Sequence, residues 1–215
     1  MMQIARIKEI TLGLLNWVTN DLKNSPADEN TFLYKVLGDS QDGNFNFFKQ
    51  AKAIYSRDDE NSRKIGVSME FPRDRMNVPL YVVREPRRSP NQDAAIGGYV
   101  EPYIGIGSDL GEYRDTKQFS FTILCVSENF LESILLSEVL YSLYLASWET
   151  LNKEFTRISF GLEEVVAESN IFPIPLFMRA INLNFSSENY VPPISTENLA
   201  DFIKFQYEPG IINKG

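Results

Sequence analysis

The side chains that could do acid–base chemistry are few in this sequence. Glu163, Glu164 and Glu168 lie close together, and a pair of carboxylates can act as general acid and general base. Adjacent residues of a strand point to opposite faces, however, and no partner group accompanies these glutamates. We therefore interpret Glu163 and Glu164 as part of a solvated strand edge.

A second acidic group could in principle bind a metal ion. Asp58, Asp59 and Glu60 lie beside Arg57, but they lack the spacing and the glycine that a calcium loop requires. We interpret this group as an exposed loop. The chain contains no histidine, which removes the commonest general base and zinc ligand. The residues thus predict no metal site.

Two further motifs are weak. Gly105, Gly107 and Gly111 resemble a phosphate-binding loop, but the last glycine is one residue late and a strand pattern follows in place of a helix. The single cysteine, Cys125, cannot form an internal disulfide and lies in an apolar run, so we expect a small buried side chain. We predict no cofactor and no catalytic residue, so the chain is not expected to be an enzyme.

Composition limits the class of protein. The chain has 215 residues, 43% of them hydrophobic, which favours one domain with extensions. A net charge of −8 disfavours nucleic-acid binding by charge alone, although a local basic patch could exist. The N-terminus lacks the pattern of a signal peptide. Residues 130–148 include Glu132, Glu138 and four serines, so we do not expect them to cross a membrane.

Residues 118–155 predict a central strand and one long helix. The strand pattern covers 119–126, Ser127 is placed to cap the helix, and apolar residues recur at three and four from Phe130 to Phe155. The apolar stripe, which includes Tyr141 and Trp148, exceeds the roughly 100° that a surface helix needs. We therefore expect this helix to be covered both by the sheet and by a neighbour.

The remaining elements complete an α+β fold. We expect an N-terminal helix over 3–22, a short strand or helical turn near 32–37, a helix over 46–55, strands over 64–71 and 77–84, a turn at 157–160 with a strand to 166, and a last strand ending at Phe185. Residues 85–117 predict a glycine- and proline-rich arm or hairpin. The predicted architecture is a mixed, mainly antiparallel sheet packed by the long central helix and the N-terminal helix. The domain spans 1–186, including the arm, and 187–215 form a C-terminal extension.

This order of elements resembles the tail-terminator and head–tail joining (neck ring) proteins of tailed bacteriophages. The resemblance rests on Asn77-Val78-Pro79-Leu80-Tyr81-Val82-Val83, on Phe119-Ser120-Phe121-Thr122-Ile123-Leu124-Cys125-Val126-Ser127-Glu128-Asn129, and on Ile174-Pro175-Leu176-Phe177-Met178-Arg179-Ala180-Ile181-Asn182-Leu183-Asn184-Phe185. It covers about 64–186 and is a similarity of pattern and order. The first hundred residues are longer than in a minimal terminator, and the C-terminal extension is additional.

The resemblance implies a structural virion protein that forms an oligomeric ring joining portal or neck to tail. Its implied partners are other copies of itself, a portal or neck protein, and tail proteins. DNA would pass through the ring without specific binding, and assembly would occur in the host cytoplasm. Two alternatives remain: a small-molecule-binding α+β protein or enzyme with a glycine-rich lid, and a cytoplasmic adaptor that binds one partner protein.

Charge gives a candidate interface. Residues 73–88 are net basic and include Arg84, Arg87 and Arg88, whereas 149–168 are net acidic and include Glu163 and Glu164. Two different patches of opposite sign would meet at every joint of a head-to-tail ring. With Tyr141 and Trp148, these residues form the predicted interface. A DNA contact by the same arginines, or two ordinary solvated faces, are the alternatives.

Overall fold

The computed structural model describes residues 3–38, 40–57, 64–71, 78–90, 101–103, 112–165 and 176–191. The chain divides into two compact units, one formed by 1–89 and 118–187 and the other by 90–117 and 188–215. The first unit combines helices with a mixed, mainly antiparallel sheet, which confirms the predicted α+β class. A two-stranded hairpin of β1 (Gln41–Asp42) and β2 (Phe45–Asn46) precedes this sheet.

The main sheet has the strand order β3-β4-β6-β8-β7, and β5 pairs with β6. These strands are β3 (Gly66–Ser68), β4 (Leu80–Pro90), β5 (Glu101–Tyr103), β6 (Glu112–Ser127), β7 (Thr156–Val165) and β8 (Phe177–Val191). β3 runs parallel to β4, and β7 runs antiparallel to β8. β6 lies in the middle of the order, so the predicted central strand is confirmed.

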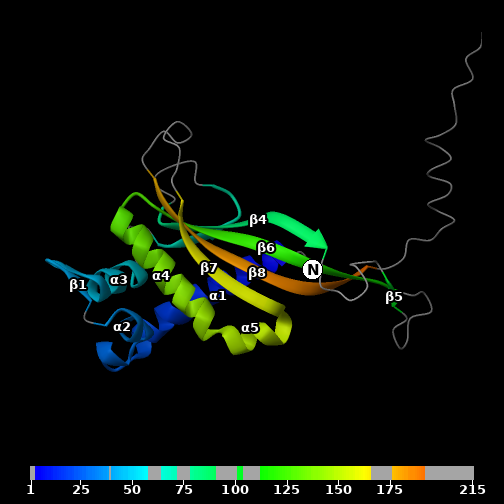
Figure 1. The fold of residues 1–215 in the computed structure, drawn as a ribbon. Coiled ribbons are helices and arrows are strands. Elements are labelled where there is room, and N and C mark those ends of the chain that lie inside the picture. The colour runs from blue at the N-terminus through cyan, green and yellow to red at the C-terminus, as the bar shows by residue number, and fades with distance from the viewer. Residues whose placement is uncertain are drawn as a thin grey trace, which may run out of the picture. The chain divides into compact units, whose positions relative to one another are not determined.

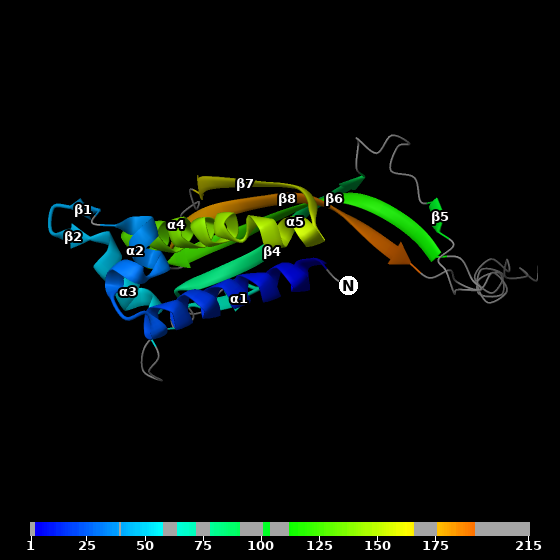
Figure 2. The same cartoon turned by 90° about the horizontal axis from the view of Figure 1, so that it is seen from below.

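The helices are α1 (Gln3–Asn24), η1 (Asp28–Asn30), α2 (Phe32–Leu37), α3 (Phe47–Tyr55), α4 (Phe130–Ala146) and α5 (Trp148–Glu154). Figure 1 looks onto the β7 edge of the sheet, and Figure 2 shows the helices gathered on one face of it. α1 packs against β3 and α4 packs against β7. The predicted N-terminal helix is confirmed, and the segment at 32–37 is helical rather than extended.

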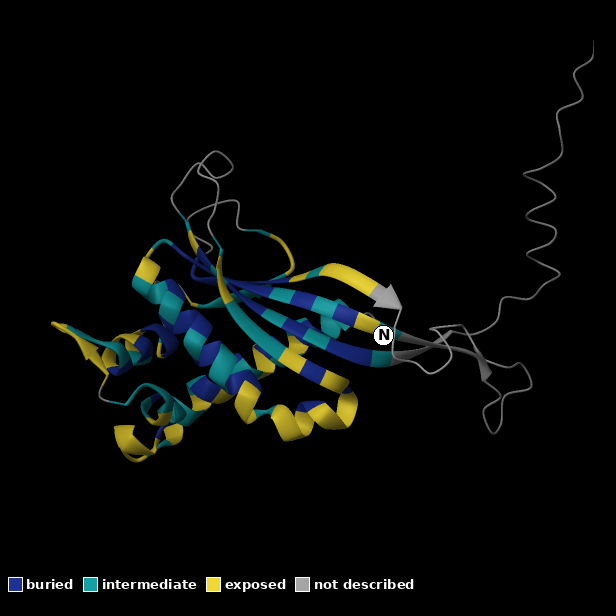
Figure 3. Cartoon of the chain, viewed as in Figure 1, coloured by how far each residue is buried: buried dark blue, intermediate teal, exposed yellow. Residues whose placement is uncertain are grey.

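Strand alternation explains where the core lies. In β6, Phe121, Ile123 and Cys125 face the helices and are buried, whereas Leu124 and Val126 belong to a smaller apolar cluster. Because successive strand residues point to opposite faces, this smaller cluster lies on the face of the sheet away from the helices. Figure 3 shows the buried positions concentrated where the sheet meets α4.

The prediction of one continuous helix over 130–155 is wrong. The helix breaks at Ser147, and α4 and α5 are bent by 65°. The Ser147 hydroxyl donates to the carbonyl of Leu143 at 2.8 Å, a bond that often bends helices. The bend brings Leu151 and Phe155 into the core, and the Phe155 ring lies 4.2 Å from that of Phe185.

The predicted helix cap is also wrong by two residues. Asn129 caps α4, because its side chain accepts from the backbone N–H groups of Leu131 and Glu132. Ser127 is the last residue of β6, and its hydroxyl accepts from the N–H of Asn129 and donates to Glu132. Ser127 therefore shapes the turn before the helix rather than the helix end itself.

Several strand limits differ from the prediction. β4 runs to Pro90, so the arm predicted from residue 85 begins as a continuation of this strand. β7 is one strand from Thr156, although Arg157 has a positive φ of 54° and the register shifts there. β8 continues to Val191, into the segment assigned to the C-terminal extension. Cross-strand pairing sustains all three strands beyond the range that their own alternation indicates.

The second unit contains the short strand expected in the arm. Glu101 to Tyr103 (β5) pair with Glu112 to Arg114 at the start of β6, in antiparallel register. The partner is thus the central strand and not another short strand. The rest of the predicted arm, residues 91–100 and 104–111, and residues 192–215 lie outside the described residues. So do the acidic group at 58–60 and Glu168.

Candidate functional site

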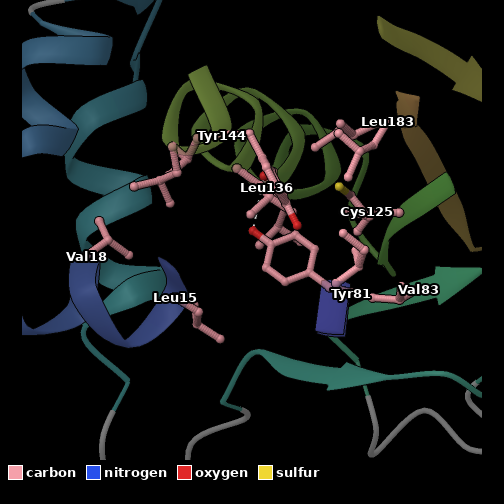
Figure 4. Packing of buried hydrophobic residues seen from close by; sticks show 14 of the residues in the cluster. Leu15, Val18, Tyr81, Val83, Cys125, Leu136, Tyr144 and Leu183 are labelled. Atoms are coloured by element: carbon pink, nitrogen blue, oxygen red, sulfur yellow. Dashed lines mark hydrogen bonds between the residues drawn. The ribbon is translucent and has the colours of Figure 1, made fainter. Parts of the chain in front are cut away.

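Two buried tyrosines form a hydrogen-bonded chain to the central helix. The Tyr81 hydroxyl in β4 donates to the carbonyl of Leu136 in α4 at 3.1 Å, as Figure 4 shows. The hydroxyls of Tyr55 and Tyr81 lie 2.7 Å apart. Because the single Tyr81 proton is already donated, Tyr55 must be the donor to Tyr81. Burial raises the pKa of both hydroxyls above the usual range, so both stay neutral.

The other buried titratable groups are also structural. Tyr144 lies 2.9 Å from the Thr11 hydroxyl, which itself donates to Ile7, so Tyr144 is the donor to Thr11. Cys125 is buried, which confirms the prediction of a buried side chain. This burial raises the pKa of its thiol and so disfavours the reactive thiolate form. Among the residues that the structure describes, no group of three His, Cys, Asp or Glu could hold a metal ion.

The β7 edge carries exposed carboxylates. Glu163 lies across from Ala180 in β8, and Glu164 lies across from Arg179. Arg179 donates to Ser137 and Glu138 of α4 at 3.2 and 3.1 Å, so Glu164 has a cation beside it. Glu163 has no cation opposite it, since its partner in β8 is Ala180. Leu162 and Ile181 face the core beneath the helices, so the next residue, Glu163, projects from the opposite face of the sheet.

An exposed apolar stripe adjoins this edge. We define the apolar stripe as five outward side chains of α4 and α5, which the ion pair of Glu138 with Arg179 interrupts in the middle: Phe130, Ile134, Tyr141, Leu145 and Trp148. Leu145 is 45% exposed, Phe130 42% and Trp148 40%. The stripe reaches the sheet at both ends, since Trp148 contacts Phe160 of β7 and Phe130 contacts Phe177 of β8.

The arginines lie near the opposite edge of the sheet. The last residue pair between β3 and β4 is Ser68 with Val82. Arg84, Arg87 and Arg88 therefore lie on the part of β4 that continues beyond β3. The Arg84 guanidinium lies 5.2 Å from the centre of the Phe71 ring. Met69, the residue after β3, is 42% exposed. We call Met69, Phe71, Arg84 and Arg87 the basic patch.

Arg88 differs from its neighbours. Its guanidinium forms two hydrogen bonds to Glu85, at 2.8 and 3.2 Å, and lies 4.9 Å from the centre of the Phe119 ring. The Arg88 charge is therefore already paired with the Glu85 carboxylate of the same chain. Arg87 is exposed, and no ion pair is described for it. Of the predicted interface arginines, Arg84 and Arg87 are thus better placed for a partner than Arg88.

The structure does not bring the predicted interface residues together. It places Tyr141, Trp148, Glu163 and Glu164 on the β7 side of the sheet and the three arginines on the β4 side, with β6 and β8 between them. Sequence reasoning missed Met69, Leu145 and the Phe130–Phe177 pair. Periodicity could not reveal Leu145, because apolar residues lie all around α4 and its exposed apolar positions look like its buried ones. Met69 and Phe177 lie at strand ends, where alternation does not indicate which residues stay exposed.

Comparisons with known proteins leave the family open. No protein-family model and no curated protein matches the chain. Within the described residues no single helix is long and apolar enough to cross a membrane, and α4 with α5 passes the length and composition test only as a bent pair. Much of α4 is buried in the core, including Leu136, Leu140 and Tyr144.

Proposed function

We propose that the chain is a self-assembling structural subunit that forms a homo-oligomeric ring in the virion of a tailed bacteriophage. The observation that carries the proposal is the placement of unlike charge on one sheet. Arg84 and Arg87 lie on the β4 side, whereas Glu163 lies on the β7 edge. A subunit with two different, complementary sides can repeat head to tail, and a ring forms when the rotation closes.

The apolar stripe supports self-assembly. Single exposed hydrophobic side chains are ordinary on a protein surface, but several together at one place mark an interaction site. Phe130 and Phe177 form one exposed apolar group at the start of α4, Leu145 and Trp148 form a second one at its end, and both groups lie on the helix side of the sheet. Covering them with another protein would remove this apolar surface from water.

The place of the ring follows from the family resemblance alone. The ring would lie at the head–tail junction or at the tail end, joining the portal or neck protein to tail proteins. DNA would pass through it without sequence-specific binding. The chain would assemble in the host cytoplasm and remain in the virion. The self-assembly proposal does not depend on this placement and can be tested separately.

Native mass spectrometry and negative-stain electron microscopy, with and without portal or tail protein, test the proposal. We expect ring-shaped particles of a single stoichiometry, in at least one of these mixtures. Monomer alone in every mixture would contradict it. A metabolite-dependent rise in melting temperature would instead favour a ligand-binding protein with a lid, and a stable one-to-one complex with an unlike partner would favour an adaptor.

A further inference from the structure

Resting on the proposed self-assembly, we propose that each joint places the β7 edge of one copy against the basic patch of the next, with the Trp148 end of the apolar stripe on the helix side of that edge and Glu163 on its other side. The partner is a second copy of this chain. The joint is heterologous, which means that the two copies contribute different surfaces. After one joint, one copy still has a free basic patch and the other a free apolar stripe, so further copies add until the two ends meet and the ring closes.

Both surfaces offer apolar area. On one side Leu145 and Trp148 are exposed and Phe160 lies under Trp148. On the other side Met69 is exposed, and the Phe71 ring lies beneath the Arg84 guanidinium. Arginine and aromatic side chains are enriched at protein interfaces, where large side chains form the central contacts. The apolar parts therefore supply the attraction at the joint.

The charged groups determine orientation. Glu163 lies opposite Ala180 and Arg87 is exposed, so each can take a partner from another copy without breaking a bond described within the chain. By contrast, Arg88 already binds Glu85 and Glu154 already binds Arg6. Complementary charge favours the joint between unlike sides, and like charge disfavours contact between two β7 edges or between two basic patches.

The β7 edge also differs from the part of β4 that continues past its pairing with β3. β7 has ten residues and no proline, and among the described strands only β8 pairs with it. A long free edge of this kind is a site where other chains attach, and proteins usually protect or cover it. β4 carries Pro86 and Pro90, which donate no backbone hydrogen bond. We therefore assign the contact to side chains rather than to a continuous strand ladder.

Variants that block one surface each test the assignment. Leu145→Arg places a cation in the apolar stripe, facing the arginines of the basic patch, and the double variant Met69→Glu/Arg87→Glu alters only the basic patch. Lys35→Glu in α2 and Asn16→Arg in α1 are matched controls at exposed helical positions. Each blocking variant alone should lose the ring, whereas both controls should retain it. Circular dichroism of every variant checks that the fold is kept.

Mixing the two blocking variants distinguishes the joint types. A heterologous joint predicts that an equimolar mixture forms a dimer and stops there, because only one intact surface of each kind remains. If Met69→Glu/Arg87→Glu assembles by itself while Leu145→Arg does not, the joint is isologous through the stripe and the inference is wrong. If wild type and both variants form rings equally well, the assignment of the joint is wrong, but the proposed function still stands.

A charge exchange gives an independent check. Arg87→Glu alone should weaken assembly at low salt, and Glu163→Arg added to the same chain should restore it, since both signs are then reversed. The recovery should diminish at high salt, where exposed charges are screened. If the second change does not restore assembly, Glu163 and Arg87 do not face each other across the joint. Absence of any wild-type assembly, with or without portal and tail protein, would instead overturn the proposed function itself.

Discussion

Tyr81 in β4 donates its hydroxyl proton to the carbonyl of Leu136, in the middle of α4. A helix carbonyl that accepts a side-chain proton in addition to its own helical bond fixes the helix against the strand. Both residues are fully buried. This bond therefore adds to the apolar packing that holds α4 against the sheet, on which the direction of the apolar stripe depends.

Replacing Tyr81 with phenylalanine should destabilise the fold. The change removes the bond to Leu136 and leaves the Tyr55 hydroxyl without its acceptor, and an unsatisfied buried polar group costs about 1–3 kcal/mol. Urea unfolding followed by fluorescence measures the loss. Tyr141→Phe, at a partly exposed position, is the control and should change stability by less than about 0.5 kcal/mol. Equal stability of both variants would contradict the described bond.

Asn129 should be the residue that begins α4. Asn129→Ala removes the acceptor for two free N–H groups and should cost about 0.5–2 kcal/mol. Asn129→Asp, which can accept the same bonds, should retain most of the stability. Thermal melts of the three proteins decide between this cap and one formed by Ser127 alone, for which Asn129→Ala would be neutral.

The ion pair between Arg6 and Glu154 should make stability depend on pH. Two hydrogen bonds of 2.7 Å join them, and the Arg6 guanidinium lowers the pKa of Glu154 below its usual value near 4.5. A carboxyl whose pKa is lower in the folded state contributes stability above its unfolded pKa and loses it as pH falls through the folded pKa. Both side chains are more than a third exposed, so the contribution should not exceed about 1 kcal/mol.

The Glu154→Gln variant isolates this contribution. Wild type should be more stable than the variant at pH 7, and the difference should shrink as the pH is lowered below about 4.5. Denaturant unfolding at several pH values measures it, and added salt should reduce it. A difference that grows on acidification would show that the sign, and hence the described ion pair, is wrong.

Cys125 should resist thiol reagents in the folded protein. It is fully buried and burial raises its pKa, whereas the reactive species is the exposed thiolate. We expect rapid labelling by a thiol-specific reagent in urea and very slow labelling in native buffer. Fast labelling of the native protein would indicate that the sheet opens between β6 and α4.

The fold class and the main elements could be predicted because their periodicity is strong. Phe119 to Val126 alternates and then becomes apolar, and α1 repeats at three and four residues, so both elements follow from pattern alone. The break at Ser147 could not be predicted in this way. Periodicity continues across it to Phe155, and the bend depends on packing Phe155 against Phe185, a contact between residues far apart in the sequence.

The candidate surfaces were predictable only in part. Charge counts identified the arginines of β4 and the glutamates of β7, since net charge needs no coordinates. They could not separate Arg87 from Arg88, because the two are adjacent and only the contacts of Arg88 with Glu85 and Phe119 distinguish them. The strand order that separates the two groups likewise depends on long-range pairing.

The central claim is that this chain assembles with itself through the two sides of its sheet. Its most direct test is the native mass of the wild type and of Arg87→Glu at low salt, alone and with portal or tail protein. We predict for the wild type one closed species whose mass is a whole multiple, three or more, of the 24.6 kDa subunit mass, and a larger monomer fraction for the variant. A wild type that remains monomeric in every mixture would contradict the claim.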